Sequence, residues 1–266
     1  MYDHVRSFLR LLSVLILTLT LRAVSAQSMS PSGSFGLLIN ASYSDLSNNN
    51  GFVVLAVANF DGAGSVSGSY TVELGSSPTQ TSQPITGTFT GTYSSNPDGT
   101  GTLTTTADNG TIFTFATVIT DGGQGLQLVG TSCSTCDIGG ATIISGFART
   151  AYAGSLNAGS YGLQTINSPL PAATVGVASF DGAGNVTMSS TFVGLSGTSG
   201  KPNIFTGSNS GTYSSNPDGS GAITLTAPNG NTQTFVFVVT DGGSGLLLLQ
   251  TNRAGNGVSF GTGRRQ

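Results

Sequence analysis

The chain has 266 residues, of which only 7% are charged, and it contains 40 glycines and no tryptophan. Its single histidine is His4, within a segment that we interpret as a signal peptide, so the mature chain would hold none. Without histidine, Ser-His-Asp triads, Cys-His pairs, His-ligated zinc and imidazole acids or bases are excluded.

Residues 1–26 have the three parts of a secretory signal peptide. Arg6 and Arg10 form a positive start, residues 11–21 are an apolar run too short to span a bilayer comfortably, and small residues lead up to Ala26. We therefore expect cleavage near Ala26. The mature protein would be secreted, periplasmic or at the cell surface, with no transmembrane helix.

The mature chain would carry five basic and ten acidic residues, a net charge of −5. Lys201 is its only lysine, and its arginines are scattered. Because nucleic-acid binding requires clustered cations that release counterions from phosphates, the sequence argues against nucleic acid as a partner.

The rest of the chain is an internal duplication. Residues 91–99 recur letter for letter at 211–219, and residues 60–129 align with 180–249 without a gap, with 36 of 70 positions identical. This period is far longer than the 20–50 residues of solenoid repeats, so each copy has the size of a domain. The predicted organisation is a signal peptide at 1–26, a first unit at 33–150, a linker at 151–158 and a second unit at 159–266.

Turn signals recur every 8–12 residues within each unit, which is typical of all-β folds. Asn96-Pro97-Asp98-Gly99 predicts a tight hairpin. Between the turns, apolar residues alternate with Thr, Ser or Ala, as in antiparallel sheets that cover a core with one face. For the first unit we predict eight strands, near 35–40, 52–60, 65–74, 85–93, 101–106, 111–119, 125–131 and 141–149.

Eight strands joined by short turns favour an up-and-down meander, and eight strands can close a small barrel without exposed edges. The predicted fold class is all-β: two homologous eight-stranded antiparallel up-and-down units in tandem, each a barrel or a strongly curled sheet. A single sixteen-stranded outer-membrane barrel is disfavoured by the polar, Thr-rich faces. The positions expected to line the interior are Val66, Val72, Leu103, Phe115, Val186, Phe192, Ile223, Leu225, Phe235 and Phe237.

The ends of the two units share a pattern. Gly33-Ser34-Phe35 opens the first unit and Arg149 ends it, while Gly159-Ser160-Tyr161 opens the second and Arg264 ends it. This resembles calycins, the lipocalins and their relatives, although Trp is replaced by Phe and Tyr and the other lipocalin motifs are missing. The resemblance implies that each arginine closes its barrel by lying on the ring of Phe35 or Tyr161. The repeated Phe-Asp-Gly-x-Gly and Gly-Thr-Tyr motifs also resemble exported bacterial proteins of unassigned function, which implies no activity.

Six of the ten mature acidic residues are followed by glycine, namely Asp61, Asp98, Asp121, Asp181, Asp218 and Asp241. A carboxylate pair for hydrolysis or a calcium loop is one interpretation. Because Asp-Gly is ordinary turn chemistry and recurs at the same places in both copies, we interpret these residues as structural. Glu73, the only glutamate, has Val193 as its counterpart, and we expect it at the surface.

Cys133 and Cys136 are the only cysteines. They have no histidine to complete a zinc site and no βαβ context for redox work. In an exported protein we therefore predict a disulfide that pins a loop. We predict no catalytic residue, no metal and no cofactor.

The expected function is a non-enzymatic binding or cell-envelope interaction module, whose ligand is a small apolar molecule or an envelope component. One alternative is a surface structural or adhesive protein, and another is a hydrolase that uses paired aspartates. A carrier requires an interior cavity, whereas a structural protein predicts filled barrels and a flat exposed patch. A hydrolase requires two carboxylates about 5–9 Å apart in one cleft.

Overall fold

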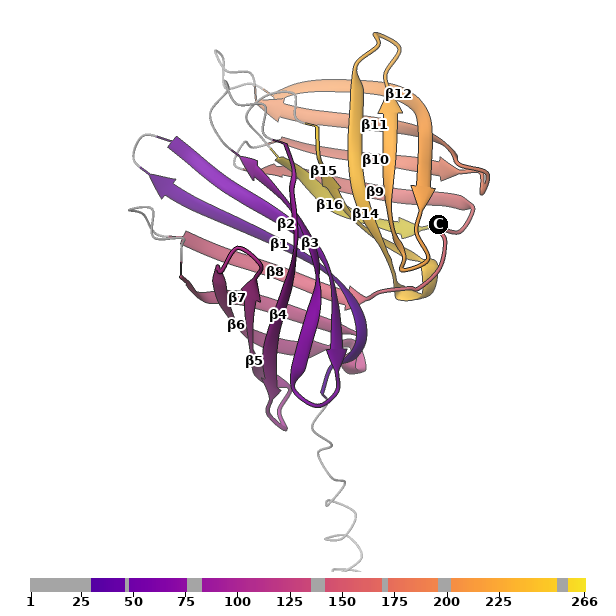
Figure 1. The fold of residues 1–266 in the computed structure, drawn as a ribbon. Coiled ribbons are helices and arrows are strands. Elements are labelled where there is room, and N and C mark those ends of the chain that lie inside the picture. The colour runs from indigo at the N-terminus through magenta and orange to yellow at the C-terminus, as the bar shows by residue number, and fades with distance from the viewer. Residues whose placement is uncertain are drawn as a thin grey trace, which may run out of the picture.

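The chain forms two closed antiparallel barrels of eight strands, one for each copy of the duplicated sequence (Figure 1). The computed structural model describes residues 30–45, 48–75, 83–134, 142–168, 172–195, 202–252 and 258–266. Barrel 1 contains β1 to β8 and barrel 2 contains β9 to β16, and in each the last strand pairs with the first. The all-β, tandem prediction is confirmed, and each unit is a closed barrel.

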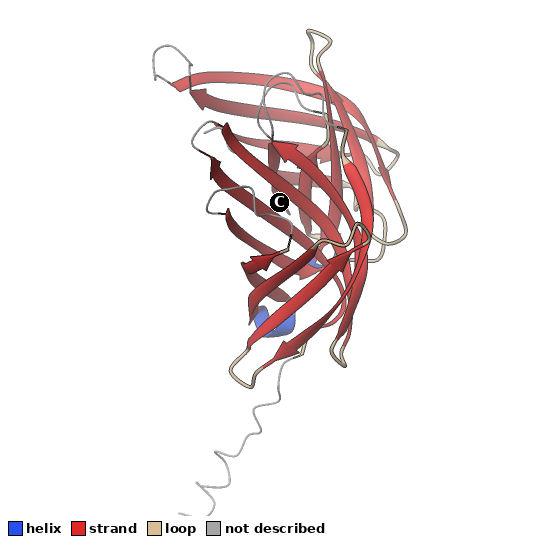
Figure 2. Ribbon diagram, turned by 60° about the vertical axis from the view of Figure 1, so that its left-hand side comes forward, coloured by secondary structure: helices blue, strands red, loops and turns tan. Residues whose placement is uncertain are grey.

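The strands of barrel 1 are β1 (Ser32–Asp45), β2 (Asn48–Asp61), β3 (Ser65–Gly75), β4 (Ile85–Ser95), β5 (Thr100–Ala107), β6 (Ile112–Thr120), β7 (Gly125–Cys133) and β8 (Thr142–Thr150). Those of barrel 2 are β9 (Gly159–Ser168), β10 (Ala172–Phe180), β11 (Asn185–Leu195), β12 (Pro202–Ser215), β13 (Ser220–Thr226), β14 (Thr232–Thr240), β15 (Gly245–Gln250) and β16 (Val258–Arg265). Figure 2 shows how completely strands dominate; the described helical segments are the short 3₁₀ turns η1 (Asp121–Gly123) and η2 (Asp241–Gly243).

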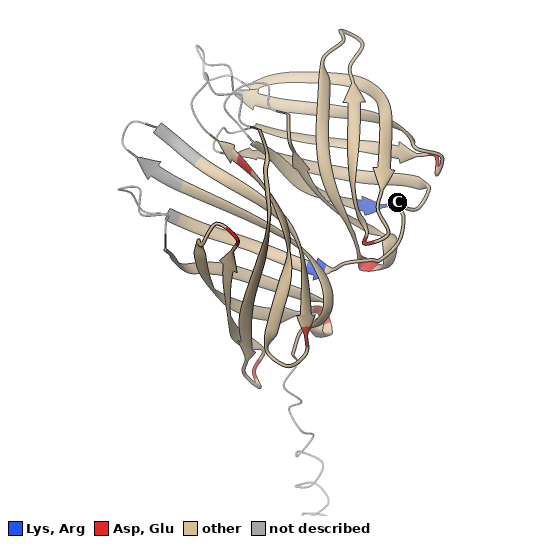
Figure 3. Cartoon of the chain, viewed as in Figure 1, with Lys and Arg blue, Asp and Glu red and all other residues tan. Residues whose placement is uncertain are grey.

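The tight turns form where Asp-Gly and Asn-Pro-Asp-Gly occur in the sequence. In the turn between β4 and β5, Gly99 has a φ of +84°, a conformation that glycine adopts without steric cost. The Asp98 carboxylate accepts the backbone N–H of Thr100 at 2.9 Å, and Asp218 does the same for Ser220 at 2.9 Å. Charged residues consequently gather at turns and strand ends (Figure 3).

One end of barrel 1 is sealed by three aromatic rings in edge-to-face contact. Phe60 lies between Phe35 and Tyr93, with ring centroids 5.3 Å and 5.0 Å away, and the Tyr93 hydroxyl donates to the Pro31 carbonyl at 2.9 Å. Each such ring pair contributes about 0.5–1.5 kcal/mol beyond the burial of area. This end is therefore closed.

Barrel 2 repeats the seal with its own three rings. Phe180 lies between Tyr161 and Tyr213, with ring centroids 5.5 Å and 5.1 Å away. The Tyr161 hydroxyl donates to the carbonyl of Gly243 at 2.7 Å, and burial raises the pKa of Tyr161. The duplication has thus preserved the closed end.

The segment that joins the barrels is packed against both of them. Ala151 donates its N–H to Ser34 at 2.8 Å and forms a bridge with Thr240 of barrel 2. Leu156 is buried in the core of barrel 2. Residues of the linker predicted at 151–158 therefore contact both barrels.

The barrels pack side by side through an apolar contact between their outer surfaces, visible in Figure 1 where β1 and β2 meet β15 and β16. On barrel 1 the contact uses outward-facing residues of the first strands, which we call the first-strand face: Gly36, Leu38, Val53, Leu55 and Val57. On barrel 2 it uses outward-facing residues of the last strands, the last-strand face: Val236, Val238, Leu247, Leu249 and Phe260. A methyl group placed on Gly36 would lie 2.9 Å from Cγ1 of Val238, so the two surfaces approach closely.

Glu73 departs from the expectation that it lies at the surface, because its residue is 0% exposed. It lies opposite Val53 in the pairing of β2 with β3 and so points away from the interior of barrel 1. The neighbouring barrel covers this outer surface, where β3 contacts β16. The burial of Glu73 depends on the contact between the two barrels, which the sequence of one unit does not reveal.

Candidate functional site

Barrel 1 contains a cavity of about 360 Å³ at the end opposite its aromatic seal. It opens beside the turn between β5 and β6, where Asn109 and Thr111 form part of its rim. Most of the described lining is aliphatic or aromatic, and none of the described lining residues is Asp, Glu, Lys or Arg. The aromatic members are Phe52, Tyr70, Phe89, Phe113 and Phe115.

Three of these rings, those of Phe52, Phe113 and Phe115, contact one another along one side of the cavity. Phe113 stacks on Phe115 with centroids 6.1 Å apart and meets Phe52 edge-on at 6.2 Å. The pairing of β5 with β6 places Phe113 opposite Thr105 and Phe115 opposite Leu103, so both rings point inward. This geometry suits a flat apolar molecule, because aromatic faces offer large contact area with little conformational freedom to lose.

A hydrogen-bonded pair stands at the mouth of this cavity. The hydroxyl of Tyr70 donates to Oδ1 of Asp108 at 2.9 Å, and the N–H of Thr88 donates to Oδ2 at 2.8 Å. The two bonds, with that of Thr88 first, lower the pKa of Asp108, while burial followed by the same hydrogen bond raises the pKa of Tyr70. Tyr70 is therefore a neutral phenol at pH 7 with a fixed orientation.

Barrel 2 contains a larger cavity of about 480 Å³ with a more polar lining. The sequence alignment shows why, because Phe52, Phe89 and Phe113 correspond to Ala172, Asn209 and Gln233. Tyr70 and Asp108 correspond to Ser190 and Pro228, so this mouth lacks the tyrosine–aspartate pair. The two cavities have thus diverged in chemistry on one shared framework.

The ten residues expected to line the interior all face inward. Val66, Leu103, Phe115, Val186, Ile223, Leu225, Phe235 and Phe237 belong to the two barrel cores, and Val72 and Phe192 line the cavities. Sequence reasoning missed Phe52, Phe89 and Phe113. A signal for them existed: at these inward positions the first copy has an aromatic residue and the second does not.

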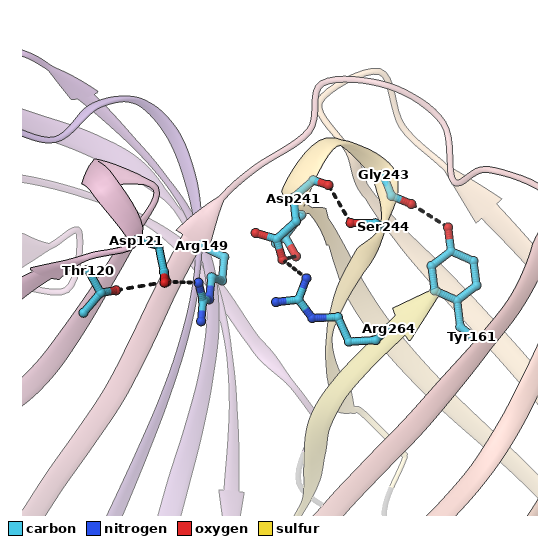
Figure 4. Close-up of polar contacts among 9 residues, drawn as sticks. Thr120, Asp121, Arg149, Tyr161, Asp241, Gly243, Ser244 and Arg264 are labelled. Carbon is cyan, nitrogen blue, oxygen red and sulfur yellow. Dashed lines mark hydrogen bonds and ion pairs between the residues drawn. The ribbon is translucent and has the colours of Figure 1, made fainter. Parts of the chain in front are cut away.

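The arginines at the ends of the barrels form ion pairs on the outside (Figure 4). Arg149 pairs with Asp121, and Arg264 pairs with Asp241 at 2.7 Å. Arg149 lies opposite Gly36 in the pairing of β1 with β8, whereas Phe35, one residue earlier, points into the barrel. The implied packing of Arg149 on Phe35 is therefore replaced by an ion pair, because the two side chains lie on opposite faces of the sheet.

Barrel 2 shows the same arrangement. Arg264 lies opposite Gly162 on the outer side, and Arg265 is the arginine opposite Tyr161. Arg265 donates to the carbonyl of Ala158 at 3.0 Å. The resemblance implied that Arg264 packs on the ring of Tyr161. Arg264 instead pairs with Asp241, and the hydroxyl of Tyr161 donates to the carbonyl of Gly243.

Four of the six Asp-Gly aspartates, Asp61, Asp98, Asp181 and Asp218, bind within their own turns. Asp61 accepts the N–H groups of Ser65 and Ala63 at 2.8 Å and 2.7 Å, and these two bonds lower its pKa. Asp181 binds its turn in the same way and its pKa is also lowered. None of the six turn aspartates lines either cavity.

Two further features concern sites proposed from the sequence. Cys133 is held in a disulfide, whereas Cys136 lies outside the described residues. Over the described part of the chain there is no group of three or more His, Cys, Asp or Glu residues suited to a metal ion. Across the same residues, no helix has the length and apolar character needed to cross a membrane.

Comparison with known proteins adds no assignment to this geometry. No protein-family model matches the chain. No curated protein matches it significantly either. The two cavities and the surfaces between and beside the barrels are therefore the features that bear on function.

Proposed function

We propose that this chain is a non-enzymatic binding protein that carries a small, uncharged, apolar molecule in the cavity of barrel 1. The observation that carries the proposal is the cavity of about 360 Å³, whose described lining is mostly aromatic and aliphatic and holds no formally charged side chain. Ligand sites typically enclose about 300–1,000 Å³ with mostly apolar walls. The cavity falls in this range.

The size of the cavity favours a carrier over a purely structural barrel. Protein interiors are packed like organic crystals and contain few voids larger than a water molecule. The eight-stranded framework can be filled with side chains, as the sealed end shows with Phe35, Phe60 and Tyr93. A filled barrel is what the structural or adhesive alternative predicts, and the open half of barrel 1 departs from it.

The lining defines the class of ligand. A charged ligand would lose its hydration without a partner, which is costly in an apolar site. The polar groups at the rim are Tyr70, Asn109 and Thr111, which suit a ligand with one polar edge directed outward. The molecule we propose is therefore flat, neutral and largely hydrocarbon.

The placement of the carboxylates supports a non-enzymatic role. The alternative of a hydrolase with paired aspartates requires two of them in one cleft. The turn aspartates instead accept N–H groups from their own loops or pair with Arg149 and Arg264. In the proposed binding role, these carboxylates stabilise turns and strand ends and do not contact the ligand.

A fluorescence titration tests the proposal with N-phenyl-1-naphthylamine, a neutral aromatic probe. Ala107 lines the cavity of barrel 1, and its counterpart Ala227 lines that of barrel 2. We expect the wild-type chain to bind the probe saturably, Ala107→Trp to weaken binding by at least tenfold, and Ala227→Trp to leave this binding unchanged. Circular dichroism of both variants controls for folding. Equal effects of the two substitutions, or no saturable binding by the wild type, would contradict the proposal.

We also propose that the protein acts outside the cytoplasm. The signal peptide predicted at residues 1–26 lies outside the described residues. The proposal is supported by the sequence pattern of that segment alone. N-terminal sequencing of the protein from the envelope and culture-medium fractions tests it, and the expected mature start is Gln27. An intact segment 1–26 on cytoplasmic protein would refute it.

A further inference from the structure

The exposed apolar side chains on the outer walls are not scattered. On barrel 1 they are Ile112, Val118, Val129 and Ile143, and on barrel 2 they are Ile166, Val175, Val177, Val193 and Ile204. The first group lies on β6 to β8, and the second lies on β9 to β12. Contiguous exposed apolar patches commonly mark interaction sites.

These two patches are the counterparts of the two surfaces that already pack together within the chain. Val118 and Val129 occupy the positions of Val238 and Leu249, on the last-strand face that barrel 2 presents to barrel 1. The strand pairing agrees, because Val129 lies opposite Ser145 just as Leu249 lies opposite Phe260. Barrel 1 therefore has its own last-strand face, uncovered: Ala116, Val118, Gln127, Val129 and Ser145.

Barrel 2 likewise has an uncovered first-strand face. Val175 and Val177 occupy the positions of Leu55 and Val57, and they are 61% and 36% exposed. Together with Gly162, Gln164 and Ala173 they form the counterpart of the surface that barrel 1 uses within the chain. Within the chain, the first-strand face of barrel 1 and the last-strand face of barrel 2 cover each other. The last-strand face of barrel 1 and the first-strand face of barrel 2 are exposed.

A groove marks the open face of barrel 2. It has a volume of about 670 Å³, and Gly162, Val175, Val177 and Thr191 are among the residues that line it. Gly162 is the counterpart of Gly36, against which Val238 and Leu247 pack closely within the chain. A methyl group on Gly162 would instead meet no atom nearer than 3.4 Å. Within the chain, the last-strand face of barrel 2 covers the first-strand face of barrel 1 around Gly36. The matching surface around Gly162 on barrel 2 is uncovered.

We propose that a second copy of this chain fills that groove with the last-strand face of its barrel 1. The contact would repeat the one inside the chain, so the copies associate head to tail. Such a contact joins two different surfaces, which leads to open filaments or closed rings rather than to symmetric dimers. The proposal does not depend on ligand binding in barrel 1.

The charge of the open face does not oppose this contact. The open face of barrel 2 carries Val193 where barrel 1 has Glu73. Arg264, the one residue with a charged side chain in the described lining of the groove, is already paired with Asp241. In the strand order of barrel 2, β10 lies three positions from β15 around a ring of eight. The open face also includes Gly162 and Gln164 of β9, the strand that pairs with β16. The second copy would therefore lie beside barrel 1, whose β2 contacts β9.

The contact between copies is weaker than the one within the chain. Gln127 and Ser145 stand where barrel 2 has Leu247 and Phe260. Amide and hydroxyl groups contribute less to an apolar interface than these side chains do, because burying them costs free energy unless they are hydrogen-bonded. The association is consequently reversible and depends on protein concentration.

Sedimentation velocity of the chain from Gln27 onward tests the proposal. We expect species larger than monomers that grow with concentration. Val175→Lys and Val129→Lys should each reduce association more than tenfold, whereas Thr102→Lys, on the exposed outer wall of β5, should not. Circular dichroism checks that each variant folds.

Mixing the two disabling variants gives the sharpest result. Each retains one intact face, so a mixture of Val175→Lys and Val129→Lys should form one-to-one dimers that grow no further. Dimers abolished by Val175→Lys but not by Val129→Lys would indicate a symmetric contact through barrel 2 and overturn the proposal. A wild-type chain that remains monomeric at millimolar concentration would also overturn it.

Discussion

Replacement of Leu249 by alanine should destabilise the protein strongly, although Leu249 points away from the interior of its own barrel. Its residue is 0% exposed because barrel 1 covers it. Full burial of a leucine side chain contributes about 1.5–3 kcal/mol, and the cavity that remains after truncation raises the usual loss to about 2–5 kcal/mol. We expect a loss of that size in the free energy of unfolding.

The matched control is Val129→Ala, at the same position in the first copy. Val129 is 57% exposed, and substitutions at such surface positions usually change stability by less than about 0.5 kcal/mol. Urea unfolding followed by circular dichroism, at protein concentrations low enough to keep the chain monomeric, measures both variants. If Leu249→Ala costs no more than Val129→Ala, the apolar contact between the barrels is not formed in solution and the reasoning is refuted.

Two further predictions concern close packing and acid stability. Gly36→Ala should destabilise the chain by about 1 kcal/mol, because the added methyl group overpacks against Val238. Gly162→Ala should stabilise the chain by about 0.4–1 kcal/mol, because it restricts the unfolded chain. Urea unfolding measures both changes in stability, and two changes of the same sign would contradict this prediction. The pKa of Asp181 is lowered by hydrogen bonds from Asn185 and Ala183, so its stabilising effect is fully present above the unfolded value of about 3.9 and is lost as the pH falls through the lower folded pKa. Asp181→Asn should therefore lose less stability than the wild type between pH 5 and pH 2, and an unchanged pH profile of the unfolding midpoint would argue against a role for this carboxylate.

The strands and turns could be predicted because the sequence encodes them locally. Asp98-Gly99 and its copy Asp218-Gly219 mark tight turns, and the structure has turns there. Between the turns, a period of two in the apolar residues identifies the inner face of each strand. Because the two copies share these turn sequences, both units are predicted to have the same arrangement of strands.

The contact between the barrels is encoded in a different pattern. The run Leu246–Leu249 is apolar at every position, which is typical of a strand buried on both faces. Leu246 and Leu248 belong to the core of barrel 2, while Leu247 and Leu249 pack against barrel 1. Alternation alone cannot reveal this second face, because it assumes that the outer wall meets water.

The cavity and the ion pairs depend on geometry that has no local signature. Whether inward side chains meet across a barrel depends on its radius and on their combined volume. The sequence therefore placed Val72 and Phe115 in the interior, but it could not show whether they line a cavity or fill the barrel. The partner of Arg149 depends on register, and a shift of one residue would move it to the other face of the sheet. Only the three-dimensional structure settles that Asp121, rather than Phe35, receives this arginine.

Native mass spectrometry of the protein purified from the organism that makes it tests the central claim most directly. We expect the wild-type chain to retain one small neutral molecule as a noncovalent adduct. This adduct should be lost in Ala107→Trp, which fills the cavity of barrel 1, and retained in Ala227→Trp. A wild-type chain that carries no adduct, or an adduct that survives Ala107→Trp, would contradict the assignment of the barrel 1 cavity as the ligand site.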